Sequence, residues 1–285
     1  MSKPADGSRE YVLGTDPVEL ERLGVQHRLW GDAAHALWRR AGIAPGARVL
    51  DVGCGPGYAS VDLAQLVGAE GRVVGLDESE GFIGELNRRA GVLGLGHLSG
   101  HVGDVQAIGA ALAGEVDDGG DVGFDAAFAR WVLCFVPDPA AVIAGIVERL
   151  RPGGRVVLFD YFNYGSMTMA PRDAAFDEVV RAIGAAWRAP GGDPDVMGRM
   201  PGILLDAGLE VTHLDVHQRI ARPGGAMWAW PTTFFASFLP RIVETGFMSE
   251  ELHQEMLAMW ARASGDASRF MTLPPVWEIV ATKPG

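Results

Sequence analysis

Residues 49–58, Val-Leu-Asp-Val-Gly-Cys-Gly-Pro-Gly-Tyr, constrain the fold of this chain more than any other segment. An apolar run ends in three closely spaced glycines, and a pattern typical of a helix follows. Glycine permits a tight turn and lets a ligand come close to the backbone. The first N–H groups of the following helix have no partner inside the helix and can face that ligand. The segment therefore predicts a strand, a loop and a helix that bind a nucleotide-like molecule at the carboxyl end of the strand.

Short apolar runs and helix-length connections alternate over residues 48–160. The expected strands are 48–52, 72–77, 98–102, 124–129 and 155–161. The expected helices are 58–67, 79–90, 109–114 and 139–150, with Ser79 as an N-cap, a loop at 117–123 and a turn at 152–154. Further helices are expected at 173–187, 196–207 (ending at Gly208), 226–246 and 249–263, and strands at 209–220 and 276–282. This alternation predicts a parallel sheet with helices on both faces.

The composition narrows the classes of partner. The formal net charge is −12 and no basic stripe is present, which disfavours nucleic acid and favours a small-molecule substrate. No apolar run approaches the roughly 18 residues that a membrane span needs, and the amino-terminal segment has no signal-peptide core. Two cysteines do not make a disulfide framework. We therefore expect a soluble, cytoplasmic protein with no membrane partner, and the sequence leaves its oligomeric state open.

Four motifs stand in an order that resembles class I S-adenosylmethionine-dependent methyltransferases of the small-molecule branch. They are the glycine-rich segment 49–57, Val74-Gly-Leu-Asp77, Gly103-Asp-Val105 and Leu150-Arg-Pro-Gly-Gly154. The resemblance covers about residues 45–162. It implies an α/β, Rossmann-like, seven-stranded and mostly parallel sheet, in which 209–220 is strand six and 276–282 is an antiparallel last strand. It also implies S-adenosyl-L-methionine as the cofactor and S-adenosyl-L-homocysteine as its product.

The chain departs from the minimal pattern of that family by carrying additional segments. We expect residues 1–44 to form an N-terminal helical cap and residues 45–162 the cofactor-binding core. Residues 163–285 would complete the sheet with strands six and seven. Helical insertions at about 162–192 and 221–270 would form a lid over the substrate.

The resemblance assigns the cofactor site residue by residue. Gly53, Gly55 and Gly57 would let the loop pass close to the methionine moiety, and Asp51 would receive its ammonium. Asp77 would accept hydrogen bonds from the ribose hydroxyls, although a helix-capping acid is the structural alternative. Asp104 and the Val105 amide would contact adenine, although Asp104 also suits an ordinary loop. The same site would include Gln26, Trp30, Cys54, Glu78, Arg130 and Trp131, of which Arg130 and Trp131 could equally be packing residues.

Methyl transfer needs a positioned nucleophile, and a base when the acceptor is a hydroxyl or a protonated amine. His27, on a predicted helix, and Tyr161, at the end of the fifth strand, are the candidate catalytic residues, with structural roles as the alternative. Candidate substrate residues are Tyr11, Asn163, Tyr164, Trp228, Phe234 and Phe235. Trp228, Phe234 and Phe235 lie in an aromatic cluster at 227–238 that would line an apolar pocket or pack the inserted helices. Asn163 and Tyr164 leave strand five near the expected methyl group, and Tyr11 belongs to the N-terminal segment.

The sequence also bears on three other classes of function. A nicotinamide-dependent oxidoreductase is disfavoured because Tyr58 stands where the Gly-x-Gly-x-x-Gly fingerprint needs its last glycine. A protein that binds the cofactor for non-methylating chemistry or regulation stays open. A metal-assisted reaction is disfavoured: His213 and His217 share one face of a predicted strand, but no carboxylate or thiol cluster adjoins them in the sequence. We therefore predict an enzyme, a methyltransferase without a metal.

Overall fold

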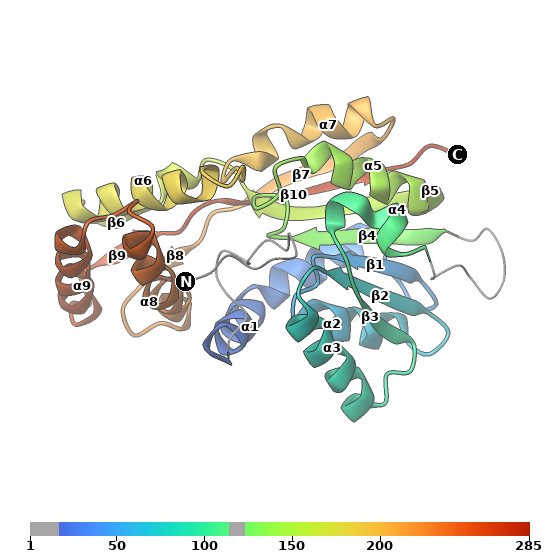
Figure 1. Ribbon diagram of the computed structural model, residues 1–285, viewed down its shortest axis with the longest axis horizontal. Helices are drawn as coiled ribbons and strands as arrows, with labels where there is room; N and C mark the ends of the chain where they lie inside the picture. The colour runs from blue at the N-terminus through green and yellow to red at the C-terminus, as the bar shows by residue number, and fades with distance from the viewer. Residues whose placement is uncertain (1–16, 114–122) are drawn as a thin grey trace.

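The computed structural model describes residues 17–113 and 123–285, and its centre is a seven-stranded sheet in the order β3-β2-β1-β4-β5-β10-β7 (Figure 1). The strands are β1 (Arg48–Val52), β2 (Arg72–Asp77), β3 (Leu98–Val102), β4 (Phe124–Arg130), β5 (Leu150–Tyr161), β7 (Glu210–His217) and β10 (Val276–Thr282). Neighbours among β1 to β5 pair in parallel, whereas β10 pairs antiparallel with both β5 and β7. The predicted fold class, with its single reversed strand, is confirmed.

Apolar strand sequences explain why the sheet lies inside the molecule. Val49, Leu50 and Phe128, on the central strands β1 and β4, are fully buried. A parallel strand with helices on both faces has no polar side to show to water, so its sequence is a continuous apolar run.

Helices cover both faces of this sheet. Figure 1 shows α1, α2 and α3 on one side of it and α4, α5 and α7 on the other. Their bounds are α1 (Pro17–Arg40), α2 (Tyr58–Val67), α3 (Glu80–Leu93), α4 (Ile108–Ala111), α5 (Pro139–Arg149) and α7 (Met200–Asp206). The Ser79 hydroxyl accepts a hydrogen bond from the Phe82 amide and caps α3 as predicted. None of the helices in the described part of the chain combines the length and the apolar composition needed to cross a bilayer.

The additional segments gather at one end of the molecule around a second, smaller sheet (Figure 1). They contain α6 (Ala174–Arg188), α8 (Ala229–Glu244), α9 (Glu250–Ser264), β6 (Thr168–Ala170), β8 (Ile220–Ala221) and β9 (Phe270–Thr272). The three strands pair in the order β6-β9-β8. Helix α6 packs on α8 and α9, and α8 also packs on α1. We call this assembly of α6, α8, α9 and the small sheet the cap. The division into the three predicted regions stays a prediction.

Several predicted elements need correction. The strand expected at 209–220 is broken, because β7 ends at His217 and β8 joins the small sheet. At the break, the Arg219 guanidinium bonds to the Leu29 carbonyl and Asp32 on α1, which draws the chain away from the main sheet. The helix expected at 196–207 begins with a 3-10 turn, and the one expected at 109–114 is the shorter α4. The turn at 152–154 lies within β5, and the loop expected at 117–123 falls almost entirely outside the described residues.

Candidate functional site

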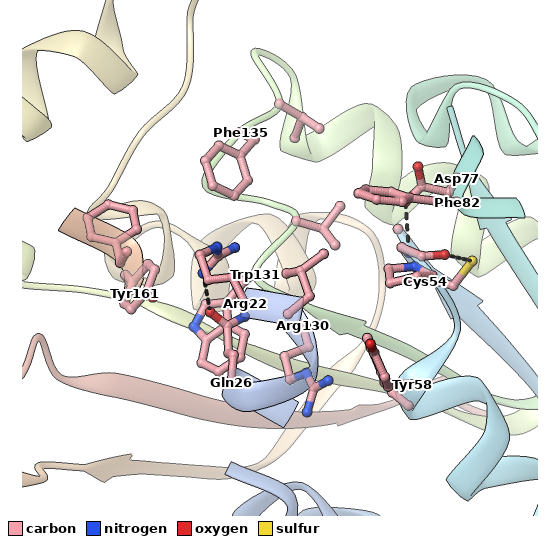
Figure 2. A pocket seen from close by; sticks show the side chains of 18 of the residues that line it. Arg22, Gln26, Cys54, Tyr58, Asp77, Phe82, Arg130, Trp131, Phe135 and Tyr161 are labelled. Carbon is pink, nitrogen blue, oxygen red and sulfur yellow. Dashed lines mark hydrogen bonds between the residues drawn. The ribbon is translucent and has the colours of Figure 1, made fainter. Parts of the chain in front are cut away.

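A cavity lies at the carboxyl ends of β1, β2, β4 and β5, and residues of α1 and α8 also line it. Figure 2 shows part of its wall. Asp51, Asp77, Arg130 and Tyr161 bring one side chain from each of these strands into its wall. Parallel strands carry their carboxyl ends to the same edge of a sheet, where α/β proteins bind their ligands. Residues far apart in the sequence therefore share one wall.

The glycine-rich loop forms the floor at one end of this cavity. Gly53, Gly55 and Gly57 have φ angles of 63°, 54° and 81°, in the left-handed region that favours glycine. A Cβ on Gly53 would lie 2.3 Å from Cγ2 of Val132, so no other residue fits there. A Cβ on Gly55 would meet nothing within 4 Å, which leaves room for a ligand against that part of the backbone.

Two carboxylates flank the loop. The Gly55 and Ser79 amides donate to the two oxygens of Asp77, both at 2.9 Å, and this ties the loop to the end of β2. Asp51 is 2 % exposed and accepts a hydrogen bond from the Ser60 hydroxyl at 2.6 Å. Burial raises the pKa of Asp51 to about 6, although Ser60 and the Arg130 charge oppose the rise. Burial also raises the pKa of Asp77 against the effect of its two backbone donors.

Arg130 joins the cavity to a polar network behind it. Its Nη2 donates to His27 Nδ1 at 3.1 Å, whereas its buried Nη1 has no hydrogen-bond partner in the described structure. Burial lowers the pKa of Arg130 to about 10, so the guanidinium stays charged at neutral pH. A buried, incompletely bonded cation at this edge suits an anionic group of a ligand.

Beyond the loop, the cavity wall continues onto Glu78, Phe82, Asp104, Val105 and Gln106. Asp104 Oδ1 accepts from the Gln106 amide at 2.8 Å and begins the 3-10 turn Val105–Ala107. The Asp104 side chain is exposed, and its second carboxylate oxygen, Oδ2, is not used by this turn.

Aromatic side chains form the opposite half of the cavity, which we call the aromatic half. They are Trp131, Phe135, Tyr161, Tyr164, Trp187, Trp230, Phe234 and Phe235. The Trp131 ring lies 6.1 Å from that of Tyr161 and 5.9 Å from that of Trp230 between centroids. Burial raises the pKa of both the Tyr161 and Tyr164 phenols, so each keeps its proton at neutral pH. This half can hold a flat apolar molecule and offers no ionised base from these two phenols.

A strained turn positions Trp131. Its φ of 53° is unusual for a residue other than glycine. Asp160, which is buried, holds the turn by accepting from the amides of Val132 and Cys134 at one oxygen and of Tyr161 at the other. Burial raises the pKa of Asp160 to about 6 against these hydrogen bonds.

Most residues singled out in the sequence lie together in this wall. They are Gln26, Asp51, Gly53, Cys54, Gly55, Asp77, Glu78, Asp104, Val105, Arg130, Trp131, Tyr161, Tyr164, Phe234 and Phe235. Gly57, His27, Trp30, Asn163 and Trp228 are outside it. Tyr11 falls outside the described residues. The individual roles predicted for these residues stay predictions.

The structure places His27 behind the cavity wall. Because Arg130 can only donate, His27 Nδ1 accepts, and His27 Nε2 then donates to Asp62 at 3.1 Å. The ring also stacks on Tyr58. Both ring nitrogens are therefore engaged away from the cavity, and this position gives the proposed base no support.

The other residues outside the wall have packing or turn roles. Trp30 is fully buried against Trp131, Phe159 and Trp230. Trp228 stacks on Trp260 of α9, with ring centroids 4.3 Å apart.

Gly57 precedes α2 against Leu86, where a Cβ would come within 2.6 Å of the leucine Cγ. Asn163 has a φ of 62° and turns the chain after β5.

Several wall residues were missed in the sequence, among them Arg22, Phe82, Gln106, Phe135 and Trp187. Arg22 had an available signal, because it stands four residues before Gln26 and so shares its helix face. Trp187 ends a predicted helix, and nothing in its local sequence indicates where that helix packs.

A second polar cluster lies away from the cavity. Both His213 and His217 bond through Nε2 to the buried Glu278, each at 2.7 Å, which confirms that they share a face. The sequence missed this carboxylate because it comes from β10, over 60 positions away. Ligand atoms of His213, Asp215 and Glu278 lie within 4.8 Å of one another. Arg40 Nε is 3.9 Å from Glu278, which disfavours a cation there, and the absence of a metal stays a prediction.

Comparison with known proteins identifies the family of this chain. A family model described as a methyltransferase domain matches residues 43–187, which is half of the chain. Similar curated proteins include the ubiquinone biosynthesis O-methyltransferase of Aromatoleum aromaticum, 32% identical over 50% of this chain and 62% of its own length. Another is the 2-phytyl-1,4-naphtoquinone methyltransferase of Synechococcus elongatus, 35% identical over 44% of this chain and 53% of its own length.

The likeness to solved structures concerns the fold. Phosphoethanolamine N-methyltransferase 2 of Haemonchus contortus superposes with a TM-score of 0.53 at 18% identity, over 89% of this chain and 53% of that one. This chain spans less than two thirds of the length of the curated relatives named here.

Proposed function

Because this chain belongs to the class I S-adenosylmethionine-dependent methyltransferases, we propose that it methylates a small, partly apolar molecule at oxygen, nitrogen or carbon. One observation carries this proposal. The glycine-rich loop, with its two flanking carboxylates, and the aromatic half are parts of one continuous cavity. A donor at the loop and an acceptor among the aromatic rings would therefore meet inside the protein.

The residues around the loop fit the cofactor. S-adenosyl-L-methionine supplies, when bound, a methyl group on a positively charged sulfur. The open space at Gly55 suits close approach of the methionine moiety. We propose that Asp51 receives the ammonium and that Arg130 binds the carboxylate through Nη1, which has no hydrogen-bond partner among the described residues. Asp77 retains lone pairs for ribose hydroxyls, and Asp104 and Val105 lie where adenine would follow.

The aromatic half supports a flat, partly apolar acceptor. The names of the two relatives given above refer to ubiquinone biosynthesis and to a naphthoquinone, and we propose an aromatic ring system of comparable character as the acceptor for this chain. Since Tyr161 and Tyr164 keep their protons, they can donate hydrogen bonds and orient such an acceptor. An acceptor with an acidic hydroxyl would need the least help from a base. Side chains of α1 and α8 that line the aromatic half would limit the access of water to the reacting atoms.

The first test is cofactor binding. Asp77→Ala should weaken binding of S-adenosyl-L-homocysteine by about 1.5–3 kcal/mol, since charge-assisted hydrogen bonds are lost. Isothermal titration calorimetry measures this, with Glu80→Ala as the control because Glu80 is an exposed acid outside the cavity wall. Unchanged affinity in Asp77→Ala would remove that carboxylate from the proposed site.

The second test is turnover. Incubation with methyl-labelled cofactor and a panel of hydroxylated aromatic compounds should give labelled products. Tight cofactor binding with no labelled product from any acceptor would favour the alternative of a cofactor-binding protein with non-methylating or regulatory function.

A further inference from the structure

A buried polar row on α1 borders the aromatic half of the cavity. Glu19, Arg22 and Gln26 are spaced three and four residues apart, so their side chains lie on one helix face. They are 1 %, 4 % and 9 % exposed. Arg22 and Gln26 are part of the cavity wall. Burying such polar groups costs free energy unless each makes its hydrogen bonds. A group in this row that lacks a partner therefore indicates where a ligand could supply one.

The row orients the Gln26 amide. Arg22 donates to both oxygens of Glu19, through Nε at 2.7 Å and Nη2 at 2.6 Å. Its Nη1 donates to Gln26 Oε1 at 3.0 Å. From the cap, Trp230 Nε1 donates to the same oxygen at 2.9 Å. Because both neighbours can only donate, the amide oxygen must face them, and this fixes the opposite side of the amide as its NH₂ group.

That NH₂ group is the unsatisfied member of the row. Gln26 Nε2 has no hydrogen-bond partner within residues 17–113 and 123–285, and Gln26 borders the cavity. An amide NH₂ only donates, and the acceptor side of this amide is already occupied by two donors. The group that completes it must therefore be an acceptor such as a carbonyl oxygen, and a pure donor has nothing to bind.

The position of Gln26 favours the acceptor molecule over the cofactor. Its partner Trp230 packs against Trp131, and Figure 2 shows Gln26 and Arg22 beside Trp131, apart from Asp77 and Cys54 of the cofactor end. Arg22 and the Tyr161 phenol line the same cavity.

We propose that Gln26 Nε2 donates a hydrogen bond to a carbonyl oxygen of the methyl acceptor, and that the Glu19–Arg22 pair positions the amide for this. The inference rests on the proposed function and narrows it to carbonyl-bearing aromatic acceptors. A buried site that is built to make a hydrogen bond discriminates strongly against an otherwise similar ligand that lacks the bonding group.

Two probes that differ only at the carbonyl test this directly: para-hydroxyacetophenone and para-ethylphenol. Both are titrated by NMR against protein saturated with S-adenosyl-L-homocysteine, so that no methyl transfer is needed. Wild-type protein should bind the ketone about tenfold more tightly than the ethyl compound, the ratio for about one net hydrogen bond. Gln26→Glu keeps an oxygen for Arg22 and Trp230 but replaces the free donor by an acceptor. This variant should lose the preference for the ketone, while affinity for the ethyl compound changes less than about threefold.

Controls separate the outcomes. Gln65→Glu on the exposed surface of α2 makes the same charge change and should keep the ketone preference. An unaltered melting temperature and unaltered S-adenosyl-L-homocysteine affinity in Gln26→Glu show that the fold and the cofactor site are intact. The inference is overturned if Gln26→Glu keeps the preference for the ketone, or if wild-type protein binds neither probe at millimolar concentration. It is also overturned if Gln26→Glu weakens the binding of S-adenosyl-L-homocysteine by the same factor as it weakens the binding of the ketone. Failure of wild-type protein to bind S-adenosyl-L-homocysteine would instead overturn the proposed function.

Discussion

The buried carboxyl of Asp51 predicts that cofactor binding weakens as the pH falls from 7 to 5. Asp51 sits at the end of β1, where burial raises its pKa to about 6, and its proposed partner is the ammonium of the cofactor. Only the ionised form attracts an ammonium. The α-amino and α-carboxyl groups of the ligand keep their charges in this range, so the pH dependence reports on the protein.

The size of the effect follows from the ionised fraction. With a pKa of about 6, roughly ten of eleven molecules carry an ionised Asp51 at pH 7, and roughly one of eleven does at pH 5. The apparent dissociation constant rises in inverse proportion to the competent fraction, which is about tenfold, or about 1.4 kcal/mol.

The same pKa acts on stability with the opposite sign. Because the pKa of Asp51 in the folded protein lies above the ordinary aspartate value of 3.8, the folded protein holds this proton more tightly than the unfolded chain does. The contribution of Asp51 to the stability of the ligand-free protein therefore increases as the pH falls from about 6 towards 4.

Isothermal titration with S-adenosyl-L-homocysteine at pH 7, 6 and 5 measures the effect. Asp51→Asn is the matched control: it is neutral, can still accept from Ser60, and should bind weakly with little pH dependence. Any slope left in this variant belongs to other groups, such as Asp77, whose pKa burial also raises. Equal slopes in wild-type protein and Asp51→Asn would refute the assigned role.

Two further substitutions test the backbone around the site. Gly53→Ala should lower stability by about 1–3 kcal/mol and weaken S-adenosyl-L-homocysteine binding, because its Cβ would collide with Val132 at a left-handed φ. Gly84→Ala, in open space within α3, should instead stabilise the protein by up to about 1 kcal/mol. Similar melting temperatures for the two variants would contradict the reasoning. Asp160→Asn should lower the free energy of unfolding by about 1–3 kcal/mol in denaturant titrations, since the amide turns an NH₂ towards backbone donors. Asp206→Asn, at an exposed position, should change the free energy of unfolding little. An equally small change in both variants would show that the turn does not depend on the Asp160 carboxylate.

The main sheet was predictable because each strand is encoded locally. The apolar runs gave β1, β2, β3 and β10 with their observed bounds, and the resemblance gave the reversal of the last strand. The small sheet was not predictable. Its strands have two or three residues each, too few for a periodic pattern, and they pair across about 50 positions (β8 with β9) and about 100 positions (β6 with β9). The break at Arg219 depends on α1, which no local pattern near residue 219 reveals.

The residues of the site were predictable where they belong to sequence motifs. They were not predictable where the rotation of a helix about its axis determines which side chains face the cavity. The glycine-rich loop, Asp77 and Asp104 all lie in the wall of one cavity, as motif order suggested. On α1 the sequence indicated a helix near the cofactor but not which face points inward. Successive helical residues differ by about 100° in direction. Gln26 therefore borders the cavity while its neighbour His27 points behind Arg130.

The small sheet also determines how the cap can move. Its strands β6, β8 and β9 connect to β5, β7 and β10 through three short links, at residues 162–167, 218–219 and 273–275. Hydrogen bonds between these strands join the links, so the cap cannot swing on one of them alone. Any displacement of the cap relative to the main sheet would therefore strain these three links together, along with residues 189–199, which join α6 to α7.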